Sequence, residues 1–116
     1  MNGRQLSALN VIFCSDEHLL TINKDFLQHD YYTDIITFDL SPSGKSPLEA
    51  ELYISIERVR DNAQSLGFPF YKELHRVVFH GLLHLMGYKD KKKTDQQTMR
   101  KMEDKLLADY FGPKDM

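Results

Sequence analysis

The sequence predicts an α+β fold in which a small mixed sheet of about three strands packs with about four helices. Short runs of β-branched and aromatic residues alternate with segments whose apolar residues recur at helical spacing. The connections between these segments are short, as in compact layered proteins. The 116 residues suffice for one hydrophobic core but not for two, so a single domain over residues 1–116 is expected.

The first part of the chain is expected to supply two strands and the helix between them. Residues 9–14 (LNVIFC) and 33–40 (TDIITFDL) are rich in strand formers. Ser15 can cap a helix, and the apolar spacing that follows predicts a helix over residues 16–28. The side chains expected on its buried face are Leu19, Ile22, Phe26 and Leu27.

The middle of the chain is expected to form a loop, a strand and a helix. Pro, Gly and Ser residues mark residues 41–48 as a flexible loop. Alternation in residues 51–55 predicts a half-exposed strand with Leu52 and Ile54 on one face. A helix follows, which Gly67 is expected to end. The residues expected on its buried face are Val59, Ala63 and Leu66.

Two helices are expected to complete the chain. The first spans residues 70–87, should be the longest, and has an apolar surface broad enough to lie across a sheet. Thr94 and Gln97 form a T-x-x-Q capping box, which predicts the start of the last helix, and Gly112-Pro113 predicts its end. The side chains expected to be buried along this last helix are Met99, Met102, Leu106, Tyr110 and Phe111.

The segment HGLLHLMGYKD, which ends the helix over residues 70–87, has the spacing of a metal site. His80 and His84 lie one helical turn apart on the same face, so both can bind one ion. Gly87 allows the chain to turn back, which can bring Asp90 in as a third ligand. Three protein ligands and one open position are typical of catalytic zinc sites. His75 lies on another side of the helix and cannot share this ion.

Two other interpretations of this segment remain open. The spacing also matches that of metzincin proteases, but their general base directly follows the first histidine, where this chain has Gly81. A metal-dependent hydrolase of another substrate, such as a peptide, is therefore an alternative that lacks its usual base. In the other interpretation, His80 and His84 are merely hydrogen-bonded histidines on a packed helix. The glycine turn and Asp90 favour the metal site.

Charge and composition limit the partners and the location. The net charge of −2 argues against a general polyanion binder, yet residues 72–116 hold ten Lys or Arg and seven Asp or Glu. The lysines around Asp90 form either a solvated loop or a phosphate-binding group. They are Lys89, Lys91, Lys92 and Lys93. A single cysteine excludes an intramolecular disulfide, and with no long apolar span or signal peptide a cytoplasmic protein without membrane contact is expected.

Three segments, in this order, are similar to the motifs of one family. Residues 80–90 are similar to the pattern H-G-x-L-H-L-x-G-Y-D-H, residues 23–38 to N-x-x-[YF]-R-x-[KH]-D-x-x-T-[DN]-V-L-S-F, and residues 50–54 to G-D-I-x-I. In these segments the chain resembles the YbeY family of bacterial endoribonucleases. The resemblance implies a zinc-dependent enzyme that cleaves single-stranded RNA. Its implied partners are the rRNA precursor and the small ribosomal subunit, in maturation of the 16S rRNA 3′ end and in ribosome quality control.

The same resemblance implies the site residues. His80, His84 and Asp90 would be the catalytic residues and would hold one Zn²⁺ per chain, which lowers the pKa of a bound water and polarises the phosphate. Whether a zinc-bound hydroxide or the RNA 2′-OH attacks is left open. The cleft is expected between this helix and the strand over residues 33–40. The candidate substrate-binding residues are Thr33, Asp34, Thr37, Lys89, Lys91 and Lys92. In an equal alternative, the first three are edge-strand residues whose side chains bond to the backbone.

This chain departs from the family pattern at several positions. Asp90 stands where the family has a third histidine, which should leave the metal a weaker Lewis acid, and Lys89 replaces an aspartate. Leu27 occupies the position of an arginine in the substrate cleft. Family members also carry a further strand and helix ahead of the segment matched by residues 9–14. Leu27 and Asp90 keep a second function open, that of a metal-containing ribosome- or RNA-binding factor with weakened nuclease activity.

Overall fold

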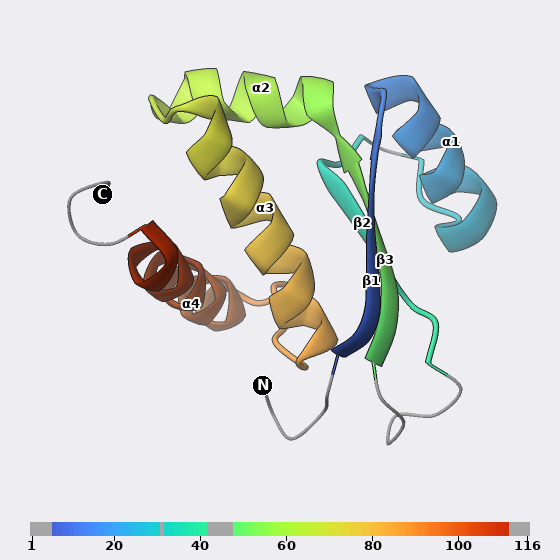
Figure 1. The fold of residues 1–116 in the computed structure, drawn as a ribbon. Helices are drawn as coiled ribbons and strands as arrows, with labels where there is room; N and C mark the ends of the chain where they lie inside the picture. The colour runs from blue at the N-terminus through green and yellow to red at the C-terminus, as the bar shows by residue number, and fades with distance from the viewer. Residues whose placement is uncertain (1–5, 31, 42–47, 112–116) are drawn as a thin grey trace.

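The computed structural model describes residues 6–30, 32–41 and 48–111, and it confirms the α+β class (Figure 1). In chain order the elements are β1 (Leu6–Cys14), α1 (Asp16–Leu27), β2 (Ile35–Asp39), β3 (Leu48–Ser55), α2 (Ile56–Leu66), α3 (Phe70–Leu85) and α4 (Lys93–Phe111). Each predicted strand and helix is present, although β1 and β3 begin earlier than expected, at Leu6 and Leu48. Residues 42–47 of the predicted loop and the Gly112-Pro113 stop lie outside the described residues.

The strands form one mixed sheet in the order β1-β3-β2. β1 runs parallel to β3 with Val11 opposite Leu52, and β2 runs antiparallel to β3 with Thr37 opposite the same Leu52. A parallel pair needs a long crossover, which α1 and β2 supply between β1 and β3. As the central strand, β3 is the most enclosed of the three, and its Leu52 and Ile54 are fully buried as predicted.

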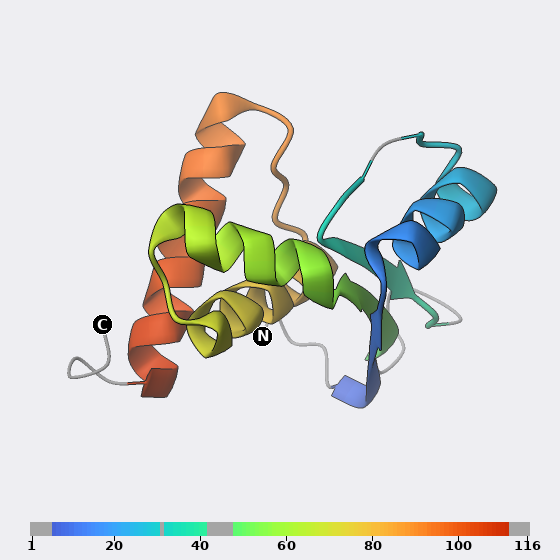
Figure 2. The same ribbon diagram turned by 90° about the horizontal axis from the view of Figure 1, so that it is seen from above.

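Helices cover both faces of this sheet, as Figures 1 and 2 show. One core cluster lies between the sheet, α2 and α3, and its buried members are Leu52, Ile54, Val59 and Val77. A second cluster lies between the sheet and α1, and its buried members are Leu19, Ile22 and Ile36. α4 packs on α3, on the side away from the sheet. The helix that carries the histidine motif is therefore held between the sheet and α4.

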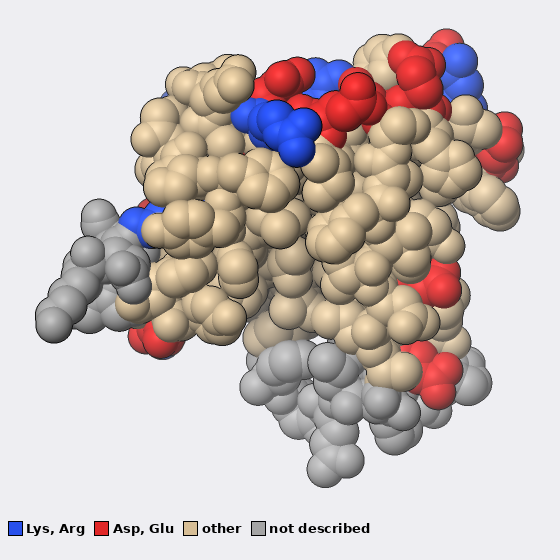
Figure 3. Space-filling view, turned by 45° about the horizontal axis from the view of Figure 1, so that its top comes forward, with Lys and Arg blue, Asp and Glu red and all other residues tan. Residues whose placement is uncertain are grey.

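Electrostatic contacts join the start of α1 to the start of α2. Arg58 donates to Asp16 through Nη2 at 2.6 Å, and the hydroxyl of Ser55 donates to Asp16 Oδ1 at 3.1 Å. Charged side chains gather along the upper edge of the face in Figure 3, where Lys and Arg lie beside Asp and Glu. The charges on that edge are thus of mixed sign.

Two of the predicted buried helix faces are wrong in part. In α1, Phe26 is 70% exposed and Leu27 is 41% exposed, whereas the polar Asn23 is buried. Phe26 meets the ring of Phe38 edge-on, and most of its surface in the last turn of α1 is left exposed. Leu66, at the end of α2, is likewise 48% exposed. Apolar spacing identifies one side of a helix but not how far the neighbouring layer extends along it.

The last helix also differs from its prediction. α4 begins at Lys93, so Thr94 lies inside the helix and cannot cap it, and α4 rather than α3 is the longest helix. Its buried residues are Met99, Glu103 and Leu107. Met102 and Leu106 are only partly buried and Tyr110 is 64% exposed, because α4 packs along α3 through residues spaced by four. No helix within the described ranges has the length and hydropathy needed to cross a membrane.

Gly81 allows α3 to approach the sheet closely. A Cβ atom at this position would lie 2.8 Å from Ile35 Cδ1, 3.0 Å from Leu52 Cδ2 and 3.1 Å from Thr37 Oγ1. Because position 81 faces the sheet directly after His80, a glutamate there would have no room. The fold therefore explains why the general base of the metzincin pattern is missing.

We expect the substitution Gly81→Ala to destabilise the fold by about 1–2 kcal/mol, since the added methyl group overpacks the contact between α3 and the sheet by more than the higher helix propensity of alanine offsets. The measurement is the denaturant midpoint of unfolding. Ser65→Ala, at an exposed position of α2, is the matched control and should change the free energy of unfolding by no more than about 0.5 kcal/mol. Equal effects of the two substitutions would contradict a close contact at Gly81.

Candidate metal centre

The chain after α3 turns back toward the helix it has just left. The turn closes through hydrogen bonds from the amide of Gly87 to the His84 carbonyl and from the amide of Tyr88 to the Leu83 carbonyl, each 3.0 Å long. Gly87 adopts a φ of +101°, a conformation that favours glycine over residues with side chains. This turn brings Asp90 alongside the two histidines, as the sequence predicted.

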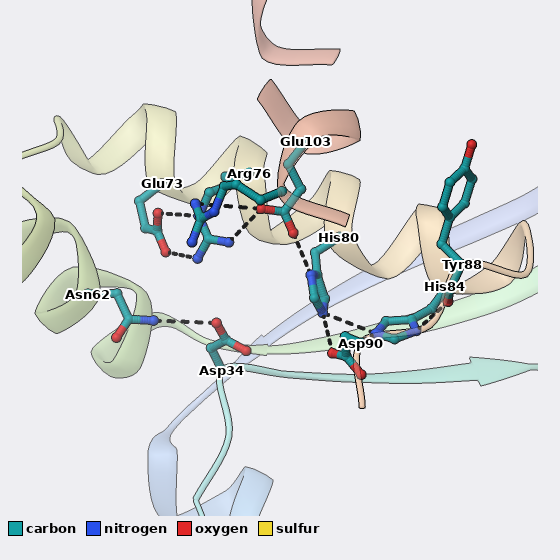
Figure 4. Close-up of polar contacts among 10 residues, drawn as sticks. Asp34, Asn62, Glu73, Arg76, His80, His84, Tyr88, Asp90 and Glu103 are labelled. Carbon is teal, nitrogen blue, oxygen red and sulfur yellow. Dashed lines mark hydrogen bonds and ion pairs between the residues drawn. The ribbon is translucent and has the colours of Figure 1, made fainter. Parts of the chain in front are cut away.

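The three predicted ligands point at one position (Figure 4). His80 Nε2 and His84 Nε2 lie 3.1 Å apart, and each lies 3.2 Å from Asp90 Oδ2. Their ligand atoms form a group that can hold a metal ion. Tetrahedral bonds of about 2.0–2.2 Å to nitrogen and oxygen would separate neighbouring ligand atoms by roughly 3.3–3.5 Å, close to the spacing observed.

Hydrogen bonds to the other ring nitrogens indicate which atoms are available to a metal. His84 Nδ1 lies 3.0 Å from the carbonyl oxygen of Tyr88, and His80 Nδ1 lies 2.6 Å from Glu103 Oε2. A carbonyl or carboxylate oxygen can only accept, so each Nδ1 carries the proton and donates it. Each Nε2 of a neutral ring then presents a lone pair toward Asp90. Lone pairs that converge in this way repel one another unless a cation lies between them, so the donor set fits a metal ion.

The surrounding charges also favour positive charge at this position. Burial opposes protonation of His80, but the hydrogen bond and charge of Glu103 outweigh it and raise the pKa of His80 above its ordinary value. Burial likewise favours the neutral form of Glu103, yet the bonds from His80 and Arg76 lower the pKa of its carboxyl. Glu103 is therefore a carboxylate, which can accept the proton of His80 Nδ1.

Glu103 belongs to a buried ionic network that the sequence patterns did not predict. Arg76 donates from Nη1 to Glu103 Oε1 at 3.0 Å, and it donates to both carboxylate oxygens of Glu73, at 2.7 Å and 2.5 Å. Glu73 is 0% exposed and Glu103 is 2% exposed. The sequence held one signal, since Glu103 lies four residues from both Met99 and Leu107 on the buried side of α4. An acidic residue in that position indicates a buried partner.

A cleft of about 570 Å³ opens beside the ligands, between α3 and β2. Three of the predicted substrate-binding residues line it, namely Thr33, Asp34 and Thr37, together with His80, His84, Asp90 and Leu27. The other three, Lys89, Lys91 and Lys92, are exposed and are not among the residues that line it. The lysines therefore lie outside the cleft rather than on its walls.

Asp34 adds a second carboxyl group to this cleft. Asn62 Nδ2 donates to its Oδ2 at 3.3 Å, and burial raises the pKa of Asp34 above its ordinary value, although the charges of Arg76 and His80 act in the opposite direction. The cleft wall opposite the histidines thus carries a carboxyl group that binds a proton more readily than an exposed aspartate does.

Comparison with known proteins identifies relatives over most of the chain. Residues 2–111 match the sequence model of the family described as Endoribonuclease YbeY. Endoribonuclease YbeY of Cytophaga hutchinsonii is 58% identical over 100 residues, covering 86% of this chain and 69% of the relative. That of Bacteroides thetaiotaomicron is 46% identical over 106 residues, covering 91% and 76%. A solution structure of a Thermotoga maritima protein aligns with a TM-score of 0.61 at 31% identity, covering 90% of this chain and 68% of the other.

Proposed function

The chain belongs to the YbeY family of endoribonucleases, and on that premise we propose that it hydrolyses phosphodiester bonds of single-stranded RNA with the help of one bound metal ion. The observation that carries this proposal is the convergence of His80 Nε2, His84 Nε2 and Asp90 Oδ2 beside an open cleft. We take the ion to be Zn²⁺, because two imidazoles and a carboxylate with an open position are a usual catalytic zinc site. Such an ion, when bound, lowers the pKa of water and stabilises charge on a phosphate.

Several residues of this chain would hold the metal ligands and the RNA in fixed orientations. Glu103 accepts the hydrogen bond of His80 Nδ1, and the Tyr88 carbonyl accepts that of His84 Nδ1. Both Nε2 atoms are therefore available to a metal ion. Thr37 offers a hydroxyl group along the cleft wall, where it can donate to phosphate or ribose oxygens. The Thr33 hydroxyl donates to the Ile35 carbonyl at 3.3 Å, so it can accept from a ribose hydroxyl instead. Asp34, on the same wall of the cleft, can accept a hydrogen bond from a ribose hydroxyl or from a water molecule that attacks the phosphate. Position 81 contributes nothing to the reaction, because it faces the sheet.

We further propose that the RNA is a precursor of the small-subunit rRNA, cleaved in the cytoplasm during maturation of the 16S 3′ end and during ribosome quality control. The support for this is the family membership. It is consistent with a modest overall net charge of −2, because a protein guided to its site by the ribosome does not need a strongly basic surface of its own.

Cleavage assays with purified protein test this function. Single-stranded RNA should be cut, while duplex RNA of the same sequence and casein should not be. A chelator should abolish cleavage, and added Zn²⁺ should restore it. Digestion of casein would favour the metal-dependent peptide hydrolase, and indifference to the chelator would contradict the metal-dependent mechanism.

One observation favours a second function, that of a metal-containing RNA- or ribosome-binding factor with weakened activity. Leu27 is 41% exposed and lines the cleft at the position where the family resemblance implies an arginine, so one phosphate contact is missing. Under this function, the protein would bind single-stranded RNA without cutting it. Asp90→Ala would then lower the melting temperature measured in the presence of Zn²⁺, while neither the wild type nor the variant would cleave RNA.

The exposed lysines after Asp90, Lys91 and Lys92, are expected to supply part of the phosphate contact that is missing at Leu27. Reversing the charge at Lys91 and Lys92 together should weaken RNA binding and reduce the slope of log affinity against log salt by about 1 for each phosphate that the variant no longer neutralises. The measurement is a fluorescence binding titration at several salt concentrations. The control for overall charge is the double variant Lys101→Glu and Lys105→Glu, which makes the same change of net charge at exposed positions of α4. If the variant with Lys91 and Lys92 reversed binds RNA as tightly as the control, these lysines form a solvated loop and do not contact phosphate.

A further inference from the structure

Glu103 lies behind the metal ligands rather than among them (Figure 4). Its two carboxylate oxygens are used separately: Oε2 accepts from His80 Nδ1 at 2.6 Å, and Oε1 accepts from Arg76 Nη1 at 3.0 Å. The residue comes from α4, whereas His80 and His84 come from α3. α4 thus contacts the metal ligand His80 through the carboxylate of Glu103.

We propose that Glu103 is a positioning residue of the metal centre, whose carboxylate keeps His80 oriented with Nε2 toward His84 and Asp90. The proposal rests on the metal site of the proposed function, and it adds α4 to the elements that build that site. Imidazole rings can rotate and exchange their two nitrogens. A carboxylate fixed at 2.6 Å from Nδ1 selects one orientation and one tautomer.

Arg76 fixes the carboxylate in turn. Its guanidinium is held by two bonds to Glu73 and has a relative side-chain exposure of 10%, so it presents Nη1 to Glu103 in a fixed direction. The two oxygens of Glu103 therefore face two different donors at once. Neither oxygen can turn away without leaving a buried N–H group unpaired, which costs about 1–3 kcal/mol.

Glutamine cannot replace Glu103 in this arrangement, although it has the same size. Its amide group has one acceptor oxygen and one NH₂ donor, while His80 and Arg76 both require an acceptor. If the NH₂ group faces His80, Nδ1 must accept, and the ring proton moves to Nε2, the atom that faces the metal. If it faces Arg76, two donors oppose each other. Either arrangement weakens the support of the metal site.

A plain structural role must be separated from positioning, because Glu103 also neutralises a buried arginine. Glu73 supplies the matched comparison: it is a fully buried glutamate that bonds the same guanidinium but does not touch His80. If Glu103 served only the ion pair, Glu73→Gln and Glu103→Gln would have similar consequences for metal binding. If Glu103 positions His80, only the second variant would lose much metal affinity.

The experiment measures the Zn²⁺ affinity of the full chain by competition with a chromogenic chelator, together with the visible spectrum of the Co²⁺-substituted protein. Glu103→Gln should weaken Zn²⁺ binding by about 10–100-fold and lower the Co²⁺ absorption, whereas Glu73→Gln should change both much less. Melting temperatures of the metal-free variants show how far each substitution affects the fold itself.

A second variant covers the case in which Glu103→Gln does not fold. Glu103→Asp keeps the charge beside Arg76 but withdraws the oxygen from His80 by one CH₂ group, so it too should weaken Zn²⁺ binding. Equal losses of affinity in the Glu73 and Glu103 variants would overturn the proposal. If wild type binds Zn²⁺ no better than His84→Ala, the metal site of the proposed function is what fails.

Discussion

Replacing His84 by alanine is expected to reduce RNA cleavage by about 10³-fold or more, because a cation at this position supplies several kcal/mol of charge stabilisation. The variant removes one of three ligand atoms that lie within 3.2 Å of one another. The remaining pair, His80 and Asp90, would hold the ion weakly and without a defined geometry. Single-turnover cleavage of a labelled single-stranded RNA, measured beside a Zn²⁺ titration, gives both quantities.

His75→Ala is the matched control for this experiment. His75 lies on the same helix, but its Nδ1 lies 2.6 Å from the Tyr71 carbonyl and its ring packs against Tyr110 and Phe111. Its loss should lower stability and leave cleavage intact at a temperature where the variant is folded. If wild type and His84→Ala cut equally slowly, the observed cleavage comes from a contaminating nuclease, and the RNA-binding function is favoured.

The positions of the strands and helices along the chain could be predicted because they depend on local patterns. Leu52 and Ile54 alternate with polar neighbours and are buried as expected, and Gly67 ends α2 with a φ of +71°. The extent of burial could not be predicted in the same way. Phe26 has helical spacing relative to Leu19 and Ile22, yet its place in the last turn of α1 leaves it exposed. Such details depend on where the neighbouring layer ends.

The metal site likewise combines residues that are close in the sequence with residues that are far apart in it. His80, His84 and Asp90 could be identified because a helix and a glycine turn place them together within eleven residues. Arg76 and Glu103 meet across α3 and α4, at a sequence separation of 27. Predicting that contact requires the packing of two helices. The expected buried side of α4 was correct at Met99, but its next two positions were each one residue too early. The ligands thus lie close together in the sequence, whereas Arg76 and Glu103, which support them, are brought together by the packing of α3 and α4.

That support should make Arg76 one of the most important residues for stability. Arg76→Met leaves the carboxylates of Glu73 and Glu103 buried without their cation, which is expected to destabilise the fold by about 3–5 kcal/mol. Burial alone would lower the pKa of Arg76, but its bonds to the two glutamates raise it, so it is charged at every pH at which the protein is folded. The Arg76 guanidinium of the wild type therefore compensates both carboxylates throughout that pH range. Denaturant unfolding of the metal-free protein measures the destabilisation.

Arg58→Met provides the comparison, since Arg58 pairs with Asp16 at 2.6 Å near the surface, with relative side-chain exposures of 34% and 20%. Water screens that pair, so its loss should cost no more than about 1 kcal/mol. Adding Glu73→Gln to Arg76→Met removes one of the uncompensated charges and should recover part of the stability. No recovery in the double variant would show that Arg76 acts through packing of its side chain, and that the charges of the network are already compensated by other means.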